Sequence, residues 1–249
     1  MEVAEYQNIA DHEEGHFYYV AVHELILHFI EEYGNLSGHL EILDAGCGTG
    51  SLAKKLERYG SVTGVDLAPE ALRISADKGV RVVESSIESM PFSTNHFDMA
   101  VSVDVIYHQH VKDDVKALKE INRVLKDGGL FVIRVPANPR LFSNHDRCVQ
   151  TARRYTEHEL REKLEASRFE ILRITHCQWG LYFPAWLKAR LDDRNPSDQE
   201  EAGKSAIGKT NPVINESMKA LSSMEKSLMS SGVNCPFGIG LLAVARKKV

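Results

Sequence analysis

"EILDAGCGTGSLAKKL", residues 41–56, places three glycines between an apolar run and a helix-like segment. Such turns often cradle a phosphate, but the order of Gly46, Gly48 and Gly50 is G-x-G-x-G, whereas the dinucleotide fingerprint is G-x-G-x-x-G. Asp44 also lies two residues before the first glycine, where a carboxylate would repel a pyrophosphate and attract an ammonium group. The loop N–H groups and the following helix N-terminus favour a carboxylate. The pattern therefore predicts a ligand that carries both groups.

A second carboxylate follows the next apolar run. The segment SVTGVDL, residues 61–67, contains Asp66, sixteen residues after Gly50. A carboxylate at the end of a second strand can accept both hydroxyls of a ribose, as it also does in NAD-binding proteins. S-adenosylmethionine is a nucleoside that carries an ammonium and a carboxylate. The glycine order and Asp44, rather than Asp66, favour it over NAD.

From residue 40 onward, short apolar runs alternate with helix-like segments. The runs that predict strands are residues 40–46, 61–67, 80–86, 97–105, 130–136, 169–177 and 238–249. The segments that predict helices are residues 15–33, 51–60, 69–79, 114–126, a short helix capped by Thr156 and Glu159, and a helix through 214–228. Strands that alternate with helices imply a parallel sheet covered on both faces. The polar residues 192–212 predict a mobile connection.

Composition excludes several classes of function. The chain has 249 residues and a net charge of −5, and it has no basic stripe interleaved with aromatic residues, so we expect no nucleic-acid partner. No apolar run approaches the ~18 residues of a membrane span. Four widely spaced cysteines and the lack of a signal-like leader favour a cytoplasmic protein with reduced thiols. The histidine spacing predicts no metal site, and the oligomeric state is not predicted.

Four blocks in a fixed order carry a family resemblance. They are ILDAGCGTG, GVDLAPEAL, ESSIESMPFSTNHFDMAVSVDVIYH and LKEINRVLKDGGLFVIRVP. In these blocks the chain resembles class I S-adenosylmethionine-dependent methyltransferases. The resemblance implies a Rossmann-like, seven-stranded, mostly parallel sheet with helices on both faces and an antiparallel last strand inserted beside the sixth. It also implies S-adenosylmethionine as cofactor and S-adenosylhomocysteine as product.

The resemblance also implies roles for single residues. Gly46 and Gly48 would line the methionine part of the cofactor, Asp44 would approach its ammonium group, and Asp66 would bind the ribose. Ser86 takes the position at which many relatives have an aspartate for the adenine amino group, and it is also a plausible turn residue. The remaining residues expected at the cofactor are Cys47, Gly50, Leu67, Ile87, Val103 and Tyr19.

Tyr19 enters through a second resemblance, to a bacterial branch of these enzymes. The segments HEEGHFYYVAVHELIL and NPRLFSNHDRCVQTARRYTEHEL carry it, and in that branch aromatic residues of the first segment lie near the cofactor mouth. Arg153 and Arg154 could bind an anionic group of a substrate or could serve as a helix cap. We expect a single methyltransferase domain over 1–249. It would comprise an N-terminal helical cover (1–35), a cofactor-binding core (36–178 and 236–249) and a lid or substrate-side insertion (179–235).

The methyl acceptor should bind beyond the carboxyl ends of the strands. That position selects Tyr107 and His108 after the fourth strand and the loop 138–146 after the fifth. His108 and His145 are candidate proton acceptors because imidazole titrates near neutrality, although either histidine could equally be structural. Tyr107, with a phenol pKa near 10, would orient the nucleophile rather than deprotonate it.

The sequence therefore predicts methyl transfer to an oxygen or nitrogen nucleophile of a small, moderately apolar metabolite. Two alternatives share parts of the pattern. A non-catalytic S-adenosylmethionine-binding protein would have every cofactor motif, and an NAD-dependent oxidoreductase would have the sheet and Asp66.

Overall fold

One seven-stranded sheet organises the residues described by the computed structural model, which are 3–192 and 210–249. The strand order is β3-β2-β1-β4-β5-β7-β6, and only β7 runs antiparallel, between β5 and β6. This arrangement confirms the predicted sheet. The strands are β1 (Leu40–Ala45), β2 (Gly60–Asp66), β3 (Arg81–Glu84), β4 (Phe97–Val103), β5 (Leu125–Pro136), β6 (Phe169–Cys177) and β7 (Gly240–Lys247).

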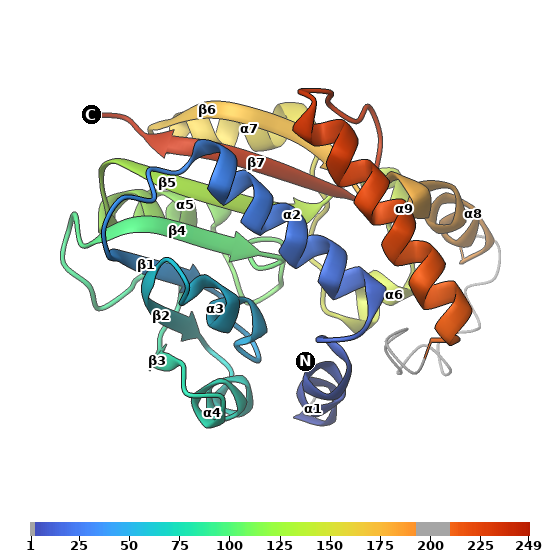
Figure 1. Ribbon diagram of the computed structural model, residues 1–249, viewed down its shortest axis with the longest axis horizontal. Coiled ribbons are helices and arrows are strands. Elements are labelled where there is room, and N and C mark those ends of the chain that lie inside the picture. The colour runs from blue at the N-terminus through green and yellow to red at the C-terminus, as the bar shows by residue number, and fades with distance from the viewer. Residues whose placement is uncertain (1–2, 193–209) are drawn as a thin grey trace.

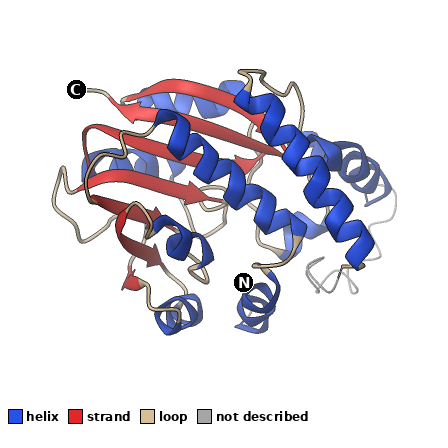
Figure 2. Cartoon of the chain, in the orientation of Figure 1, coloured by secondary structure: helices blue, strands red, loops and turns tan. Residues whose placement is uncertain are grey.

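Helices cover both faces of the sheet (Figures 1 and 2). In Figure 1, α2 and α9 cross the near face, and α5 and α7 lie behind the sheet. The helices within the described residues are α1 (Val3–His12), α2 (Phe17–Tyr33), α3 (Ser51–Leu56), α4 (Pro69–Asp77), α5 (Asp114–Val124), α6 (Asn144–Cys148), α7 (Glu157–Ala166), α8 (Tyr182–Asp192) and α9 (Pro212–Ser230), with 3-10 turns η1 (Pro139–Leu141) and η2 (Trp179–Leu181).

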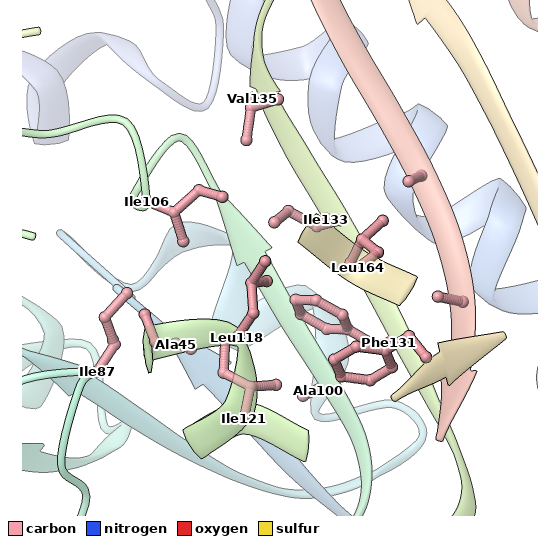
Figure 3. Close-up of a cluster of buried hydrophobic side chains, with 14 of the residues drawn as sticks. Ala45, Ile87, Ala100, Ile106, Leu118, Ile121, Phe131, Ile133, Val135 and Leu164 are labelled. Carbon is pink, nitrogen blue, oxygen red and sulfur yellow. The ribbon is translucent and has the colours of Figure 1, made fainter. Parts of the chain in front are cut away.

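Successive side chains of a strand point to opposite faces of the sheet, so the core forms two layers. On β5, Phe131 and Ile133 pack with Leu118 of α5, and Figure 3 shows this cluster. The alternate residues Leu130 and Val132 pack in the other cluster, against α2 and α3. A strand buried on both faces reads as a continuous apolar run, which is why the sequence marked it clearly.

Several elements differ from the sequence predictions. A separate helix, α1, precedes the predicted 15–33 helix, which begins at Phe17. The predicted loop 138–146 contains η1 and the start of α6. Both are short elements of about one turn, too short to show a hydrophobic period. Most of the predicted connection 192–212 lies outside the described residues. Within the described part of the chain, no helix is long and apolar enough to cross a membrane.

Candidate functional site

The glycine loop between β1 and α3 has three positive-φ positions with different surroundings. Gly46 has φ +90°, and a Cβ there would overlap the Val105 side chain. A Cβ on Gly50 would overlap Ser75 in the same way. Gly48 has φ +52°, and a Cβ there would meet nothing within 4 Å. The outer glycines therefore bring the backbone close to neighbouring elements, while Gly48 faces open space in which a ligand can approach the backbone.

Asp66, the last residue of β2, binds the backbone of this loop through its carboxylate. Its Oδ2 accepts the Gly48 N–H at 3.0 Å, and its Oδ1 accepts the Ala68 N–H at 2.9 Å. An ionised carboxylate has about four acceptor positions, so both oxygens can still accept hydroxyl donors. The side chain that the sequence assigns to the ribose therefore also fixes the loop.

Asp44 lies at the end of β1 under the same loop. It is 2% exposed, and its Oδ2 has no hydrogen-bond partner. Burial, followed by the charge of Asp66, raises the pKa of Asp44 from 3.8 to about 7. A buried carboxylate that lacks a partner is costly, and an ammonium donor from a ligand would satisfy it. Gly48, Asp44 and Asp66 thus fit an amino-acid nucleoside, whereas the two carboxylates would repel a pyrophosphate.

The residues expected at the adenine have mixed settings. Ser86 Oγ accepts the Glu88 N–H at 3.1 Å, which is the arrangement of a turn residue. Ile87 is 4% exposed and belongs to the core cluster, as Figure 3 shows. Leu67, after β2, is 44% exposed and can contact a ligand without rearrangement.

Two further residues border the loop itself. Cys47 is buried, and its N–H donates to the Val65 carbonyl at 2.9 Å, while burial raises the pKa of its thiol. Val103 is half-buried at the end of β4, the strand that pairs with β1.

The N-terminal segment is attached to the cofactor side, which the sequence indicated only through Tyr19. Glu13, 4% exposed, accepts the Thr49 hydroxyl at 2.6–2.7 Å and pairs with Lys78. In α1, burial and then the charge of Asp66 raise the pKa of Tyr6 to about 12. Tyr19 stands on α2 with its ring 5.4 Å from that of Tyr18, and burial raises its pKa.

The candidate proton acceptors come from the segments that follow β4 and β5, which are called the acceptor side below. His108 is half-buried, its Nδ1 faces the His110 N–H at 3.3 Å, and burial lowers its pKa to about 4. His145 stands on α6, and burial lowers its pKa as well. Tyr107 is half-buried, and burial raises its pKa. Both imidazoles are therefore neutral at pH 7, and Tyr107 is a hydrogen-bonding group rather than a base.

Arg153 and Arg154 bind carboxylates of this chain. Arg154 donates to both oxygens of the buried Asp146 at 2.8 and 3.0 Å, and Arg153 pairs with Asp114 at 3.2 Å. Asp146 also accepts the Ser143 N–H at 2.9 Å in the capping box that starts α6. These arginines fix the fold around His145, which favours the structural alternative over substrate binding.

Sequence reasoning missed a buried polar group at the ends of β4 and β5. Asp104 pairs with Arg134, which is 3% exposed and whose Nη2 donates to Gln178 Oε1 at 2.6 Å. Trp179 N–H donates to the buried Glu225 at 3.1 Å, and burial raises the pKa of Glu225 to about 7. The signal was present in LFVIRVP, because a lone arginine in a buried strand requires an anionic partner. Among the described residues, no three His, Cys, Asp or Glu side chains are grouped to hold a metal ion.

Comparisons with known proteins agree with this geometry. A family model described as a methyltransferase domain matches residues 43–133. Demethylmenaquinone methyltransferase of Staphylococcus aureus is 34% identical over 111 residues, which are 41% of this chain and 45% of that protein. The chain spans between 36% and 45% of the lengths of three curated relatives that it matches, which is less than half of each.

Two solved structures share the fold. An S-adenosylmethionine-dependent methyltransferase from Mesorhizobium loti has a TM-score of 0.60 at 16% identity, over 94% of this chain and 100% of that chain. Phosphoethanolamine N-methyltransferase 2 of Haemonchus contortus, in complex with S-adenosyl-L-methionine, has a TM-score of 0.59 at 19% identity, over 90% of this chain and 52% of that chain.

The chain has the fold of class I S-adenosylmethionine-dependent methyltransferases, with the same strand order and a glycine loop flanked by an acidic residue. Residues 43–133 match the family described as a methyltransferase domain.

Proposed function

We propose that this protein transfers the methyl group of S-adenosylmethionine to an oxygen or nitrogen nucleophile of a small, moderately apolar molecule. The observation that carries the cofactor half is the buried Asp44 oxygen without a partner, set under a loop whose Gly48 faces open space. In this proposal Asp44 accepts the cofactor ammonium group and Asp66 accepts the ribose hydroxyls. Cys47, Gly46 and Gly50 shape the loop, and Leu67, Ser86, Ile87 and Val103 border it.

The chain contributes position and exclusion of water. When bound, the cofactor supplies an electrophilic methyl group, and in-line displacement at such a group depends chiefly on proximity and alignment. Glu13 ties the N-terminal segment to Thr49, and Tyr19 comes from the helix that follows, so α1 and α2 together border the site. This supports the N-terminal cover of the predicted domain organisation.

Removal of a proton from the acceptor is assigned to residues that follow β4 and β5. For an acceptor that carries a proton at neutral pH, His145 or His108 is the proposed base, and the neutral form of each at pH 7 permits that role. His145 is the stronger candidate because His108 is shifted to a pKa of about 4 and its Nδ1 already faces an N–H. Tyr107 would orient the nucleophile.

Calorimetry with three ligands tests the cofactor assignment. We expect S-adenosylmethionine and S-adenosylhomocysteine to bind and NADH to give no heat, because two carboxylates face the loop. Binding of NADH alone would support the oxidoreductase alternative.

Turnover separates an enzyme from a binding protein. Purified protein with S-adenosylmethionine should release S-adenosylhomocysteine when a panel of phenols, alcohols and amines is supplied. Tight cofactor binding without product across such a panel would support the non-catalytic alternative.

A further inference from the structure

We propose that the Asp104 carboxylate faces the methyl group that is transferred and binds the amine nitrogen of the acceptor. This inference rests on the proposed function and narrows the acceptor from oxygen or nitrogen nucleophiles to amines. Its basis is the way in which β4 ends beside the glycine loop.

Asp104 occupies the point at which the strand order reverses. β1 and β4 pair in parallel with Asp44 opposite Val101, and Asp104 directly follows the last residue of β4. The next side chain, Val105, fills the space beside Gly46. Open α/β sheets bind their ligands at this crevice between the two central strands. Asp104 therefore lies at the carboxyl edge, next to the loop that receives the cofactor.

The backbone at Asp104 is held in an unfavourable conformation. Its φ is +56°, in the left-handed region that residues with a side chain seldom adopt. The Asp104 N–H donates to the Arg134 carbonyl at 2.9 Å, and Arg134 Nη1 donates to Asp104 Oδ1. The Asp104 side chain is 23% exposed above an arginine side chain that is 3% exposed. Strain that the surroundings maintain in this way is a feature of functional positions.

The chain also makes room for the arginine. A Cβ on Gly240, the first residue of β7, would lie 2.6 Å from Arg134 Nε and Nη2. Gln178, 4% exposed, accepts the second guanidinium donor at 2.6 Å. Glycine at 240 and the amide at 178 thus place the guanidinium beside Asp104, where it orients the carboxylate.

One oxygen of Asp104 remains free for a strong donor. Within residues 3–192 and 210–249, its Oδ2 accepts a hydrogen bond from the Tyr18 hydroxyl at 3.5 Å, the outer limit of such a bond, so a ligand N–H can replace or join it. Glu5 Oε1 on α1 is a second buried carboxylate oxygen without a partner. Both Glu5 and Asp104 lie close enough to Tyr19 to add to the effect of burial on its pKa.

Carboxylates among tyrosine rings select an ammonium group over a neutral hydroxyl. The charge-assisted hydrogen bond is the stronger one. A bound ammonium group first loses one proton to neutral His145, which frees the nitrogen lone pair. That lone pair then forms the bond to the methyl carbon as the carbon–sulfur bond breaks and S-adenosylhomocysteine leaves, while a remaining N–H stays bound to Asp104.

Two nucleosides test the position of Asp104 without knowledge of the acceptor. Sinefungin carries an ammonium-bearing carbon where S-adenosylmethionine has its methyl sulfonium, and S-adenosylhomocysteine has an uncharged sulfur there. Calorimetry on the wild type and Asp104→Asn should show sinefungin weakened roughly 10- to 100-fold and S-adenosylhomocysteine changed less than about 3-fold. Asp98→Asn is the matched control, because Asp98 lies on the same strand near its other end and pairs with Lys126. Its two affinities should match those of the wild type.

The outcomes separate the two proposals. If the wild type binds neither nucleoside, the proposed function fails. If both bind and Asp104→Asn weakens both equally, the position of Asp104 is overturned while the cofactor assignment stands. Should Asp104→Asn fail to fold, Gly240→Ala decides, because it displaces the guanidinium that orients the Asp104 carboxylate and keeps the carboxylate itself. Selective loss of sinefungin supports the inference, and equal loss contradicts it.

Transfer of a labelled methyl group tests whether the acceptor is an amine. With S-adenosylmethionine labelled in the methyl group, primary and secondary amines should take up label, and alcohols of matched size should not. Transfer to alcohols alone would overturn the amine assignment.

Discussion

The carboxylates around the glycine loop and those of the acceptor side differ in the partners that they have within the chain. On the cofactor side, Asp44 has an oxygen without a partner, and Asp66 is engaged only by backbone N–H groups. On the acceptor side, three carboxylates pair with an arginine: Asp104 with Arg134, Asp114 with Arg153 and Asp146 with Arg154. Asp44 therefore depends on the ligand for a partner, whereas Asp104 is already oriented by an arginine and has one oxygen left for a ligand donor.

This difference indicates where binding energy is used. A carboxylate that waits for a cation gains a partner when the cofactor binds, so affinity depends on Asp44 and Asp66. Asp146 is already paired with Arg154 beside His145, and Arg134 orients Asp104, so these groups are fixed before the acceptor binds. Fixed positions are what alignment of a nucleophile requires.

The largest expected effect tests the acceptor side. His145→Ala should lower kcat by ~10²–10⁴ on the true acceptor with cofactor affinity nearly unchanged, because a positioned base contributes that much. His108→Ala should have a small effect. Steady-state kinetics and calorimetry on both variants measure this. Full turnover in both variants would mean that neither histidine removes the proton.

The next effect tests the cofactor side. Asp66→Ala should weaken S-adenosylhomocysteine far more than Ser86→Ala, because charge-assisted bonds contribute roughly 1.5–3 kcal/mol each and a neutral bond about 0.5–1.5 kcal/mol. Part of the loss will come from the Gly48 N–H that Asp66 also accepts. Calorimetry gives both affinities. Equal losses would show that Asp66 does not hold the ribose.

A third effect appears in stability and tests whether Asp44 waits for a cation. The folded-state pKa is raised from 3.8 to about 7, so the stabilising contribution is fully present below about pH 4 and is lost as pH rises towards 7. Asp44→Asn removes this loss. Relative to the wild type, the ligand-free variant should gain stability between pH 4 and 7, on the scale of ~1.4 kcal/mol per pKa unit.

Urea unfolding at several pH values measures that difference. Addition of S-adenosylhomocysteine should restore the stability of the wild type at pH 8 and do much less for the variant. Parallel stability curves for the two ligand-free proteins would contradict the unpaired state of Asp44.

The smallest effect concerns motion. The sequence predicts that the N-terminal helix and residues 192–212 form a cover that orders when ligands bind, and residues 193–209 lie outside the described structure. Amide exchange in α1 should slow on cofactor binding, because Glu13, directly after α1, accepts the Thr49 hydroxyl of the loop. Exchange in α5, buried on the far side, is the internal reference. Identical exchange in α1 with and without ligand would rule out the cover.

The cofactor side was readable from sequence because its signals are local. Three glycines and Asp44 lie within seven residues, and buried parallel strands read as apolar runs. The Asp104 cluster was not predicted as a whole. Arg134 is visible as a lone charge in an apolar run, but Asp104, Gln178 and Gly240 come from distant segments that only the fold brings to it. The short elements α6 and η1 were missed because their starts depend on caps such as Ser143 and Asp146 rather than on a hydrophobic period.

The antiparallel last strand has a consequence for the order of assembly during synthesis. Residues 40–66, which build the cofactor loop, emerge from the ribosome long before β7, and the contacts described for the loop are made with residues 13–105. Arg134 reaches its final place only when Gly240 has entered between β5 and β6. A nascent chain can thus complete its cofactor loop early, but its acceptor side forms only after the final strand has been translated.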